Sequence, residues 1–190
     1  SERAAGRRAS LAAILGWLEQ INQALAKVHQ YGWKYLDLKP GNVLLGAGGG
    51  SVKLADFGTS RARAGEPCPG YAGTASWQPP EQFFPTPHHT YDTDWRSDYF
   101  ALGAMFYYLV TGGLPLRFCH ACGQAWREHQ SRGADMLLAA GDGKMPSTLG
   151  DDEAALFARR IRQHGRGATT SLALLRSLLA ADRAGRPSHA

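Results

Sequence analysis

The sequence predicts a single, mainly helical domain with a small β-hairpin in its first third. Apolar residues recur every three or four positions along residues 11–28, which is the spacing of one face of an α-helix. Further on, two short apolar runs flank a glycine-rich stretch at residues 46–50, a pattern typical of two strands joined by a turn. The chain has 190 residues, of which 44% are hydrophobic and 19% are charged. A chain of this size and composition folds around one core and differs from disordered proteins.

The first helix has a recognisable start and stop. Ser10 precedes the first apolar position and is a suitable N-cap, because its hydroxyl can accept a hydrogen bond from a backbone N–H of the first turn. Gly32 follows the last apolar position and is a suitable stop. The two strands are predicted at residues 43–45 and 52–55, and they form a hairpin around the flexible glycine turn.

A long loop and four further helices are predicted after the hairpin. Residues 56–81 show little periodicity, and loops of this length in a compact domain are usually functional. The next helix is predicted at residues 94–110; it is nearly apolar all round from Tyr99 onward, which places it in the centre of the domain. Three more helices, separated by glycine-containing breaks, are predicted at residues 134–140, 151–163 and 169–181.

The composition argues against two classes of function. The formal charge is +5, but Lys and Arg are scattered without the dense basic run of a nucleic-acid-binding protein. No apolar stretch approaches the length needed to span a bilayer, which is about 18 residues. The first residues also lack the pattern of a signal peptide. Three cysteines, an odd number in a chain of this size, indicate reduced thiols. We therefore expect a cytoplasmic protein with no membrane segment and no nucleic-acid partner.

Two of the cysteines form the pattern Cys119-His120-Ala121-Cys122, which could supply half of a tetrahedral zinc site. The chain contains no second pair of this kind, and the remaining candidate ligands lack a recognised spacing; they are His88, His89 and His129. The other interpretation is two free thiols in a loop. The sequence leaves both interpretations open.

The most informative segment is Tyr35-Leu36-Asp37-Leu38-Lys39-Pro40-Gly41-Asn42, followed by an apolar strand. It resembles the catalytic loop of eukaryotic-type serine/threonine protein kinases, in which an Asp and an Asn five positions later flank the site of phosphoryl transfer. Fourteen residues after Asn42, at the end of the second strand, Asp56-Phe57-Gly58 matches the second magnesium motif of the same family. Further matches follow in the order of the family: Gly73-Thr74 with Pro79-Pro80-Glu81, Asp98 with Gly103, and Arg186 with Pro187.

The resemblance covers about residues 11–188 and implies the fold of the helical C-terminal kinase lobe, with the hairpin beside the catalytic loop. Nothing before Ser10 could be the glycine-rich loop or the strand lysine that contact ATP in the family. The N-terminal lobe is therefore absent from this chain, and we interpret residues 1–190 as a partial kinase domain. We expect an N-terminal kinase lobe upstream in the whole protein.

The resemblance also implies a role for each matching residue. Asp37 would be the catalytic base, and Lys39 would neutralise charge on the transferred phosphoryl group. Asn42 and Asp56 would hold Mg²⁺ against ATP, and Leu44 would form the floor of the adenine pocket. The implied cofactors are thus ATP and Mg²⁺. Gly73 and Thr74 would belong to the activation segment, which receives a protein substrate. The remaining matches would be structural supports; they are Glu81, Asp98 and Arg186.

The catalytic loop departs from the family at two positions. Tyr35 stands where the family usually has His, and it can take over the packing against Phe57. Leu36 stands where the family usually has Arg, whose guanidinium pairs with a phosphate on the activation loop. Because Leu36 cannot form such a pair, we predict that activity does not depend on phosphorylation of the activation loop.

Two other functions remain as alternatives. A pseudokinase or single-lobe binding scaffold is favoured by the missing lobe, by the Tyr35-Leu36 pair and by an insert-like stretch at residues 117–150. A small-molecule phosphotransferase of a related fold ranks last, because such enzymes usually lack a segment like residues 73–81.

Overall fold

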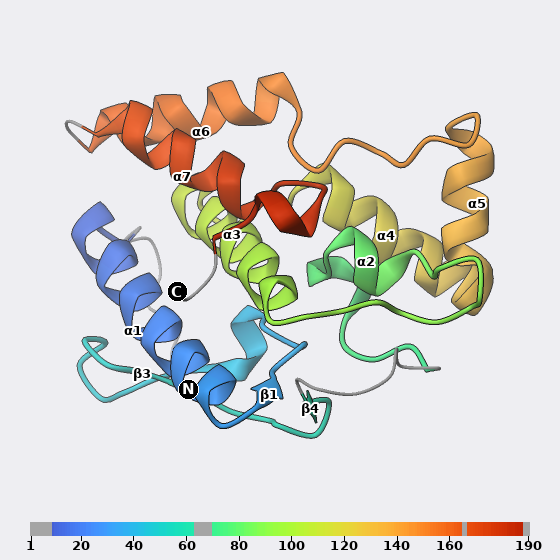
Figure 1. Ribbon diagram of the computed structural model, residues 1–190. Helices are drawn as coiled ribbons and strands as arrows, with labels where there is room; N and C mark the ends of the chain where they lie inside the picture. The colour runs from blue at the N-terminus through green and yellow to red at the C-terminus, as the bar shows by residue number, and fades with distance from the viewer. Residues whose placement is uncertain (1–8, 63–69, 165–166, 188–190) are drawn as a thin grey trace.

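The computed structural model describes residues 9–62, 70–164 and 167–187, which form a mainly helical body with two small sheets (Figure 1). The mainly helical fold class predicted from the sequence is confirmed. The α-helices are α1 Leu11–Gln30, α2 Pro80–Phe83, α3 Arg96–Thr111, α4 Arg117–His129, α5 Gly133–Ala140, α6 Asp151–Gln163 and α7 Ala168–Leu178. The strands are β1 Trp33–Lys34, β2 Val43–Leu45, β3 Val52–Leu54 and β4 Arg61–Ala62. Short 3-10 turns include Pro40–Asn42 and Ala75–Trp77.

Helix α1 begins and ends close to the predicted positions. The hydroxyl of Ser10 accepts a hydrogen bond from the N–H of Ala13, at 3.2 Å between Oγ and N, so it is the N-cap. The chain leaves the helix at Tyr31, and Gly32 takes the left-handed conformation that glycine adopts without strain, with φ of 81°. The buried face consists of Ile14, Leu18, Ile21, Leu25 and His29.

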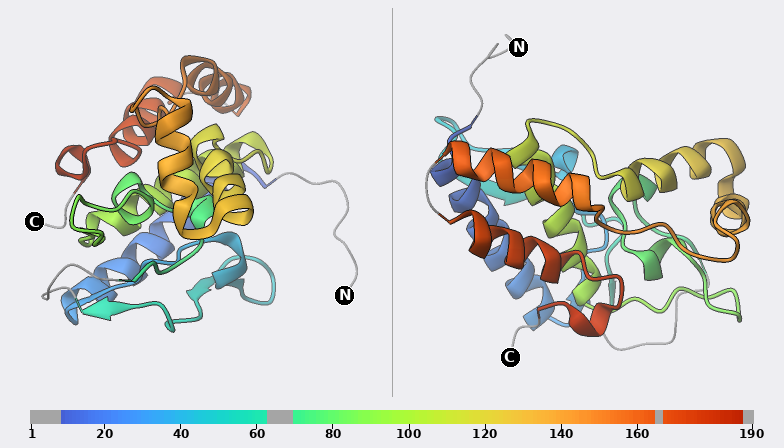
Figure 2. Two further views of the ribbon diagram at one scale, coloured as in Figure 1. Left: turned by 90° about the vertical axis from the view of Figure 1, so that its right-hand side faces the viewer. Right: turned by 90° about the horizontal axis from the view of Figure 1, so that it is seen from above.

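The predicted hairpin is present, and a second small sheet lies beside it. Strand β2 pairs antiparallel with β3, with Val43 opposite Leu54 and Leu45 opposite Val52. The unpredicted sheet joins β1 to β4, two segments of two residues each. Strands this short carry no periodicity, so the sequence pattern could not show them. All four strands lie on the same side of the molecule as α1, opposite α6 (Figures 1 and 2).

Helix α3 is the centre of the core, as its apolar sequence predicted. It packs against α1 on one side and against α6 and α7 on the other (Figure 1). Gly103 permits the close approach of α7, because a Cβ atom at this position would lie 2.8 Å from the Cβ of Leu178 and 3.0 Å from Cδ2 of Leu179.

Helix α4 corrects the interpretation of the two cysteines as loop thiols. Cys119 and Cys122 lie on the buried face of α4, with exposed fractions of 2% and 0%. Burial raises the pKa of the Cys122 thiol to about 12 and that of Cys119 further, so both stay protonated. Within the described ranges, no group of three or more His, Cys, Asp or Glu residues could hold a metal ion. In this setting the two thiols act as small apolar core residues.

No helix in the described part of the chain combines the length and the apolar character needed to cross a membrane.

Candidate active site

The side chain of Asp37 is the centre of a buried hydrogen-bonded cluster. Its exposed fraction is 5%. Its Oδ2 atom accepts hydrogen bonds from Lys39 Nζ at 2.8 Å and from Asn42 Nδ2 at 2.9 Å. Its Oδ1 atom accepts a hydrogen bond from Thr74 Oγ1 at 2.7 Å, and Lys39 Nζ donates to the same hydroxyl at 2.7 Å. Thr74 and the residues of the catalytic-loop match therefore meet at one carboxylate, that of Asp37.

Asn42 is oriented by the same carboxylate residue. Its Nδ2 atom donates to the backbone carbonyl and to Oδ2 of Asp37, both at 2.9 Å, which uses both N–H groups of the amide. The amide oxygen Oδ1 is thus the atom left to bind a cation. The backbone carbonyl of Asn42 accepts the N–H of Ala55 at 2.9 Å, and this bond ties the catalytic loop to the residue before Asp56.

Asp56 stands at the exposed edge of this cluster. It adopts a left-handed backbone conformation with φ of 56°, and its Oδ1 atom accepts the N–H of Gly58 at 3.2 Å. The ring of Phe57 meets the ring of Tyr35 edge to face, with centroids 5.2 Å apart, as predicted for this pair. The hydroxyl of Tyr35 donates to the carbonyl of Ala55. Burial, followed by the charges of Asp37, Asp56 and Asp98, raises the pKa of Tyr35, so it remains a donor.

The oxygen atoms of Asn42 and Asp56 are of the chemical type that magnesium prefers. A carboxylate and an amide oxygen are hard ligands, and Mg²⁺ usually takes one or two such protein ligands together with phosphate oxygens and waters. Asp56 is exposed, and its Oδ1 atom accepts only the N–H of Gly58 among the hydrogen bonds of the described residues. Leu44, the predicted floor of the adenine pocket, lies in β2 with 55% of its surface exposed.

Asp98 forms hydrogen bonds to the backbone at the start of the catalytic-loop match. It lies in the first turn of α3 and is 1% exposed. Its carboxylate accepts the backbone N–H groups of Tyr35 at 2.9 Å and of Leu36 at 2.7 Å. His29 Nε2 forms a third hydrogen bond to this carboxylate at 2.8 Å. The role of His29 was not predicted from the sequence, although a polar residue on the apolar face of α1 is a signal that could have indicated it.

Glu81 and Arg186 form a bidentate ion pair that joins α2 to the C-terminal part of the chain. Arg186 Nη1 lies 2.6 Å from Glu81 Oε1, and Nη2 lies 2.9 Å from Oε2. Ser97 Oγ donates to the same carboxylate at 2.8 Å. The guanidinium also donates to the backbone carbonyls of Ala180, Ala181 and Arg96. The pair thus connects α2 to α3 and to the segment after α7.

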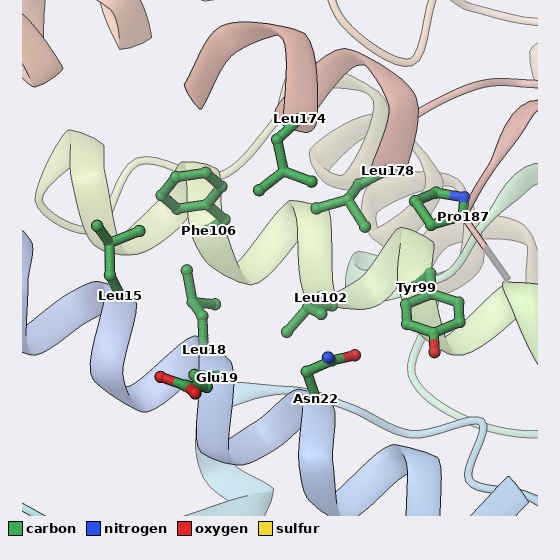
Figure 3. Close-up of a pocket in the computed structure, with 10 residues that line it drawn as sticks. All are labelled: Leu15, Leu18, Glu19, Asn22, Tyr99, Leu102, Phe106, Leu174, Leu178 and Pro187. Carbon is green, nitrogen blue, oxygen red and sulfur yellow. The ribbon is translucent and has the colours of Figure 1, made fainter. Parts of the chain in front are cut away.

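An apolar pocket lies elsewhere in the molecule, between α1, α3 and α7 (Figure 3). It has a volume of about 330 Å³, and the walls include Leu18, Leu102, Phe106 and Leu178. None of the predicted site residues lines it. It therefore lies within the helical base, by which we mean the packed helices α1, α3, α6 and α7, and it is separate from the Asp37 cluster.

Several known protein kinases are similar to this chain over about half of its length. The chain is 36% identical over 106 residues to the serine/threonine-protein kinase PknL of Mycobacterium tuberculosis. The aligned region covers 54% of this chain and 25% of PknL. The chain is 36% identical over 111 residues to PknA of the same species, covering 57% of this chain and 24% of PknA. A ribosomal protein S6 kinase alpha-6 of Danio rerio is 35% identical over 103 residues, or 53% of this chain and 13% of that protein. The matches thus span about a quarter or less of the length of these relatives.

Proteins of this kind transfer phosphate from ATP and generally use Mg²⁺, and their substrates are proteins. The sequence model of the protein kinase domain matches residues 6–190, which is nearly the whole chain. This match, and the serine/threonine kinases among the relatives, show that the chain belongs to the protein kinase domain family.

Proposed function

We propose that residues 1–190 are the C-terminal lobe of a serine/threonine protein kinase, and that the whole protein transfers the γ-phosphoryl group of ATP to Ser or Thr hydroxyls of a protein substrate. The observation that carries this proposal is one hydrogen-bonded cluster, which consists of Asp37, Lys39, Asn42 and Thr74. Phosphoryl transfer is catalysed mainly by positioning and by electrostatic stabilisation. This cluster supplies a carboxylate that can position a hydroxyl and an ammonium group that can stabilise negative charge.

In this proposal Asp37 orients the substrate hydroxyl and accepts its proton. Lys39 stays beside it, 2.8 Å away, where its ammonium group neutralises charge that develops on the transferred phosphoryl group. Asn42 and Asp56 would hold Mg²⁺, which when bound neutralises the phosphate oxygens of ATP. The exposed face of Leu44 would lie under the adenine ring.

The proposal also includes an N-terminal lobe that covers the strand side of the molecule. Five of the nine exposed large apolar side chains in the described part of the chain lie on this side; they are Tyr31, Trp33, Leu44, Leu45 and Phe57. Three of them, Tyr31, Trp33 and Phe57, line one hollow, and exposed apolar surface of this kind supports an interaction site. A second lobe on this face would bury that surface and close the nucleotide site.

We also propose that the protein is located in the cytoplasm. Cys119 and Cys122 are free, buried thiols in one helix, which suits a reducing compartment.

The test is phosphate transfer from ATP and Mg²⁺ to a protein substrate by the full-length protein and by its Asp37→Asn variant. We expect the variant to lose activity by about 100-fold or more, because a positioned base contributes about 10²–10⁴-fold. The matched control is Asp135→Asn, an exposed residue in the first turn of α5, which should keep the wild-type rate. Equal background rates for wild type and Asp37→Asn would refute the proposal and favour a binding scaffold.

A further inference from the structure

Two buried glutamine side chains lie between the activation segment and the catalytic loop. Gln78 and Gln82 have exposed fractions of 2% and 3%. Gln82 Nε2 donates to the carbonyl of Leu36 at 2.7 Å and to the carbonyl of Ala72 at 2.9 Å. Gln78 Nε2 donates to the carbonyl of Ala72 as well, and its Oε1 atom accepts the hydroxyl of Tyr71. We call Gln78 and Gln82 the amide clamp.

The chemistry of the clamp requires amide side chains. Each Nε2 atom faces backbone carbonyl oxygens, which only accept hydrogen bonds. A carboxylate in place of Gln82 would present an acceptor to two acceptors in a buried site. The Leu36 carbonyl would lose its bond to Gln82, and the Ala72 carbonyl would keep only the bond from Gln78. A group that only accepts hydrogen bonds therefore cannot replace Gln82.

On the catalytic-loop side, the clamp acts on the residue that precedes Asp37. Leu36 is buried and has a left-handed backbone conformation with φ of 66°, which costs conformational energy for a residue with a branched side chain. Such a conformation persists only where the surroundings hold it. The N–H of Leu36 is held by Asp98 at 2.7 Å, and its carbonyl is held by Gln82. Both ends of the residue next to Asp37 are thus fixed.

On the activation-segment side, the clamp encloses Gly73. This glycine has φ of 96°, and a Cβ atom there would lie 2.5 Å from the Leu36 carbonyl oxygen. The same atom would lie 2.6 Å from Gln78 Nε2 and 2.7 Å from Gln82 Nε2. Only glycine allows this close approach. The approach brings the next residue, Thr74, onto the carboxylate of Asp37.

The far end of the clamp is anchored in α4. The ring of Tyr71 stacks on the ring of Trp126, with centroids 3.8 Å apart and planes 15° apart. Burial raises the pKa of Tyr71, so its hydroxyl remains a donor to Gln78. A continuous set of contacts therefore runs from α4 through the clamp to the catalytic loop.

We propose that the amide clamp is a permanent, uncharged anchor that keeps residues 70–77 against the catalytic loop without a phosphate on the activation segment. This inference rests on the proposed function and extends it to regulation. Gln78 and Gln82 are positioning residues: they act on Asp37 through Leu36 and through Gly73-Thr74. The position where the family has a phosphate-binding Arg holds the buried, apolar Leu36, so the anchoring comes from backbone carbonyls and neutral amides instead.

The first test is hydrogen exchange of the unphosphorylated full-length protein, followed by mass spectrometry of the peptides from residues 1–190. We expect Gln82→Glu to speed exchange in residues 35–42 and 70–77 by about tenfold or more, equivalent to about 1.4 kcal/mol. Residues 151–163 in α6 should be unchanged. The control is Gln163→Glu, an exposed substitution at the end of α6 with the same change of charge, which should leave residues 35–42 and 70–77 as in wild type.

A second variant, Gln82→Met, keeps the side-chain length and removes both hydrogen bonds without adding a charge. It keeps the test valid if the Glu variant does not fold. We expect faster exchange in the same two segments, to a smaller extent than for Glu. Unchanged exchange in Gln82→Met would overturn the clamp, whatever the activity of the protein.

The second test measures phosphate transfer by the full-length protein before and after phosphatase treatment. We expect the wild-type rate and the exchange of residues 70–77 to survive the treatment, and Gln82→Met to lower kcat about tenfold with KM for ATP unchanged. Loss of turnover or faster exchange after phosphatase treatment would overturn the phosphate-free anchor. If the variants change exchange as expected but the wild-type protein transfers no phosphate, the kinase proposal is refuted and the anchor remains supported.

Discussion

The catalytic loop and the Asp56 edge belong to one candidate site but are held in different ways. In the loop, Asp37 and Asn42 are buried and bonded to each other, and Asp98 holds the backbone from inside the helical core. At the edge, Asp56 is exposed and Phe57 keeps 51% of its surface in solvent. The helical core alone therefore positions Asp37 and Asn42, the residues proposed to act at the substrate hydroxyl and the metal. The groups that would act on the nucleotide depend on whatever covers the strand side.

The largest effect should come from Asp98→Asn. The carboxylate accepts three hydrogen bonds from donors inside the core, and an amide would direct its own N–H₂ group at one or more of these donors. We expect the free energy of unfolding of the chain to fall by about 3 kcal/mol or more, measured by urea denaturation.

The control for this variant is Asp142→Asn, an exposed residue in a left-handed turn conformation that Asn also tolerates. It should change stability by less than about 0.5 kcal/mol. If the two substitutions cost the same, the buried anchoring of the catalytic loop would be wrong, and the contrast between loop and edge would disappear.

A smaller effect is expected for Arg186→Lys. The guanidinium makes two bonds to Glu81 and three to backbone carbonyls, a fork that a lysine ammonium cannot reproduce. We expect a loss of about 2 kcal/mol in the same denaturation experiment. Arg176→Lys on the exposed side of α7 is the matched change and should be nearly neutral. An equally small effect at Arg186 would mean that the helical base does not depend on this pair.

The smallest effect should be that of Phe57→Ala in the 190-residue chain. Since about half of the ring is already in water, we expect a loss of about 1 kcal/mol or less, compared with about 3–5 kcal/mol for a fully buried phenylalanine such as Phe157. In the full-length protein the same substitution should cost clearly more, because the second lobe would bury the ring. Equal costs in both contexts would show that nothing covers this edge.

Much of the fold could be predicted from the sequence because its signals are local. The start of α1 at Ser10, the β2–β3 hairpin and the apolar helix α3 follow from capping, turn chemistry and periodicity. Helix α4 was missed because Cys119 and Cys122 were considered as ligands or loop thiols; counted as apolar residues, they complete a helical face with Phe118 and Ala125.

By itself the sequence determined the helical class, the family and the order of the motifs, because these depend on residue types and spacings along the chain. Only the tertiary structure decided that Thr74 meets Asp37, that His29 supports Asp98 and that Gln82 holds Leu36. The physical reason is that each of these contacts joins segments 37 or more residues apart, and their geometry comes from how the helices pack. No local pattern carries that information.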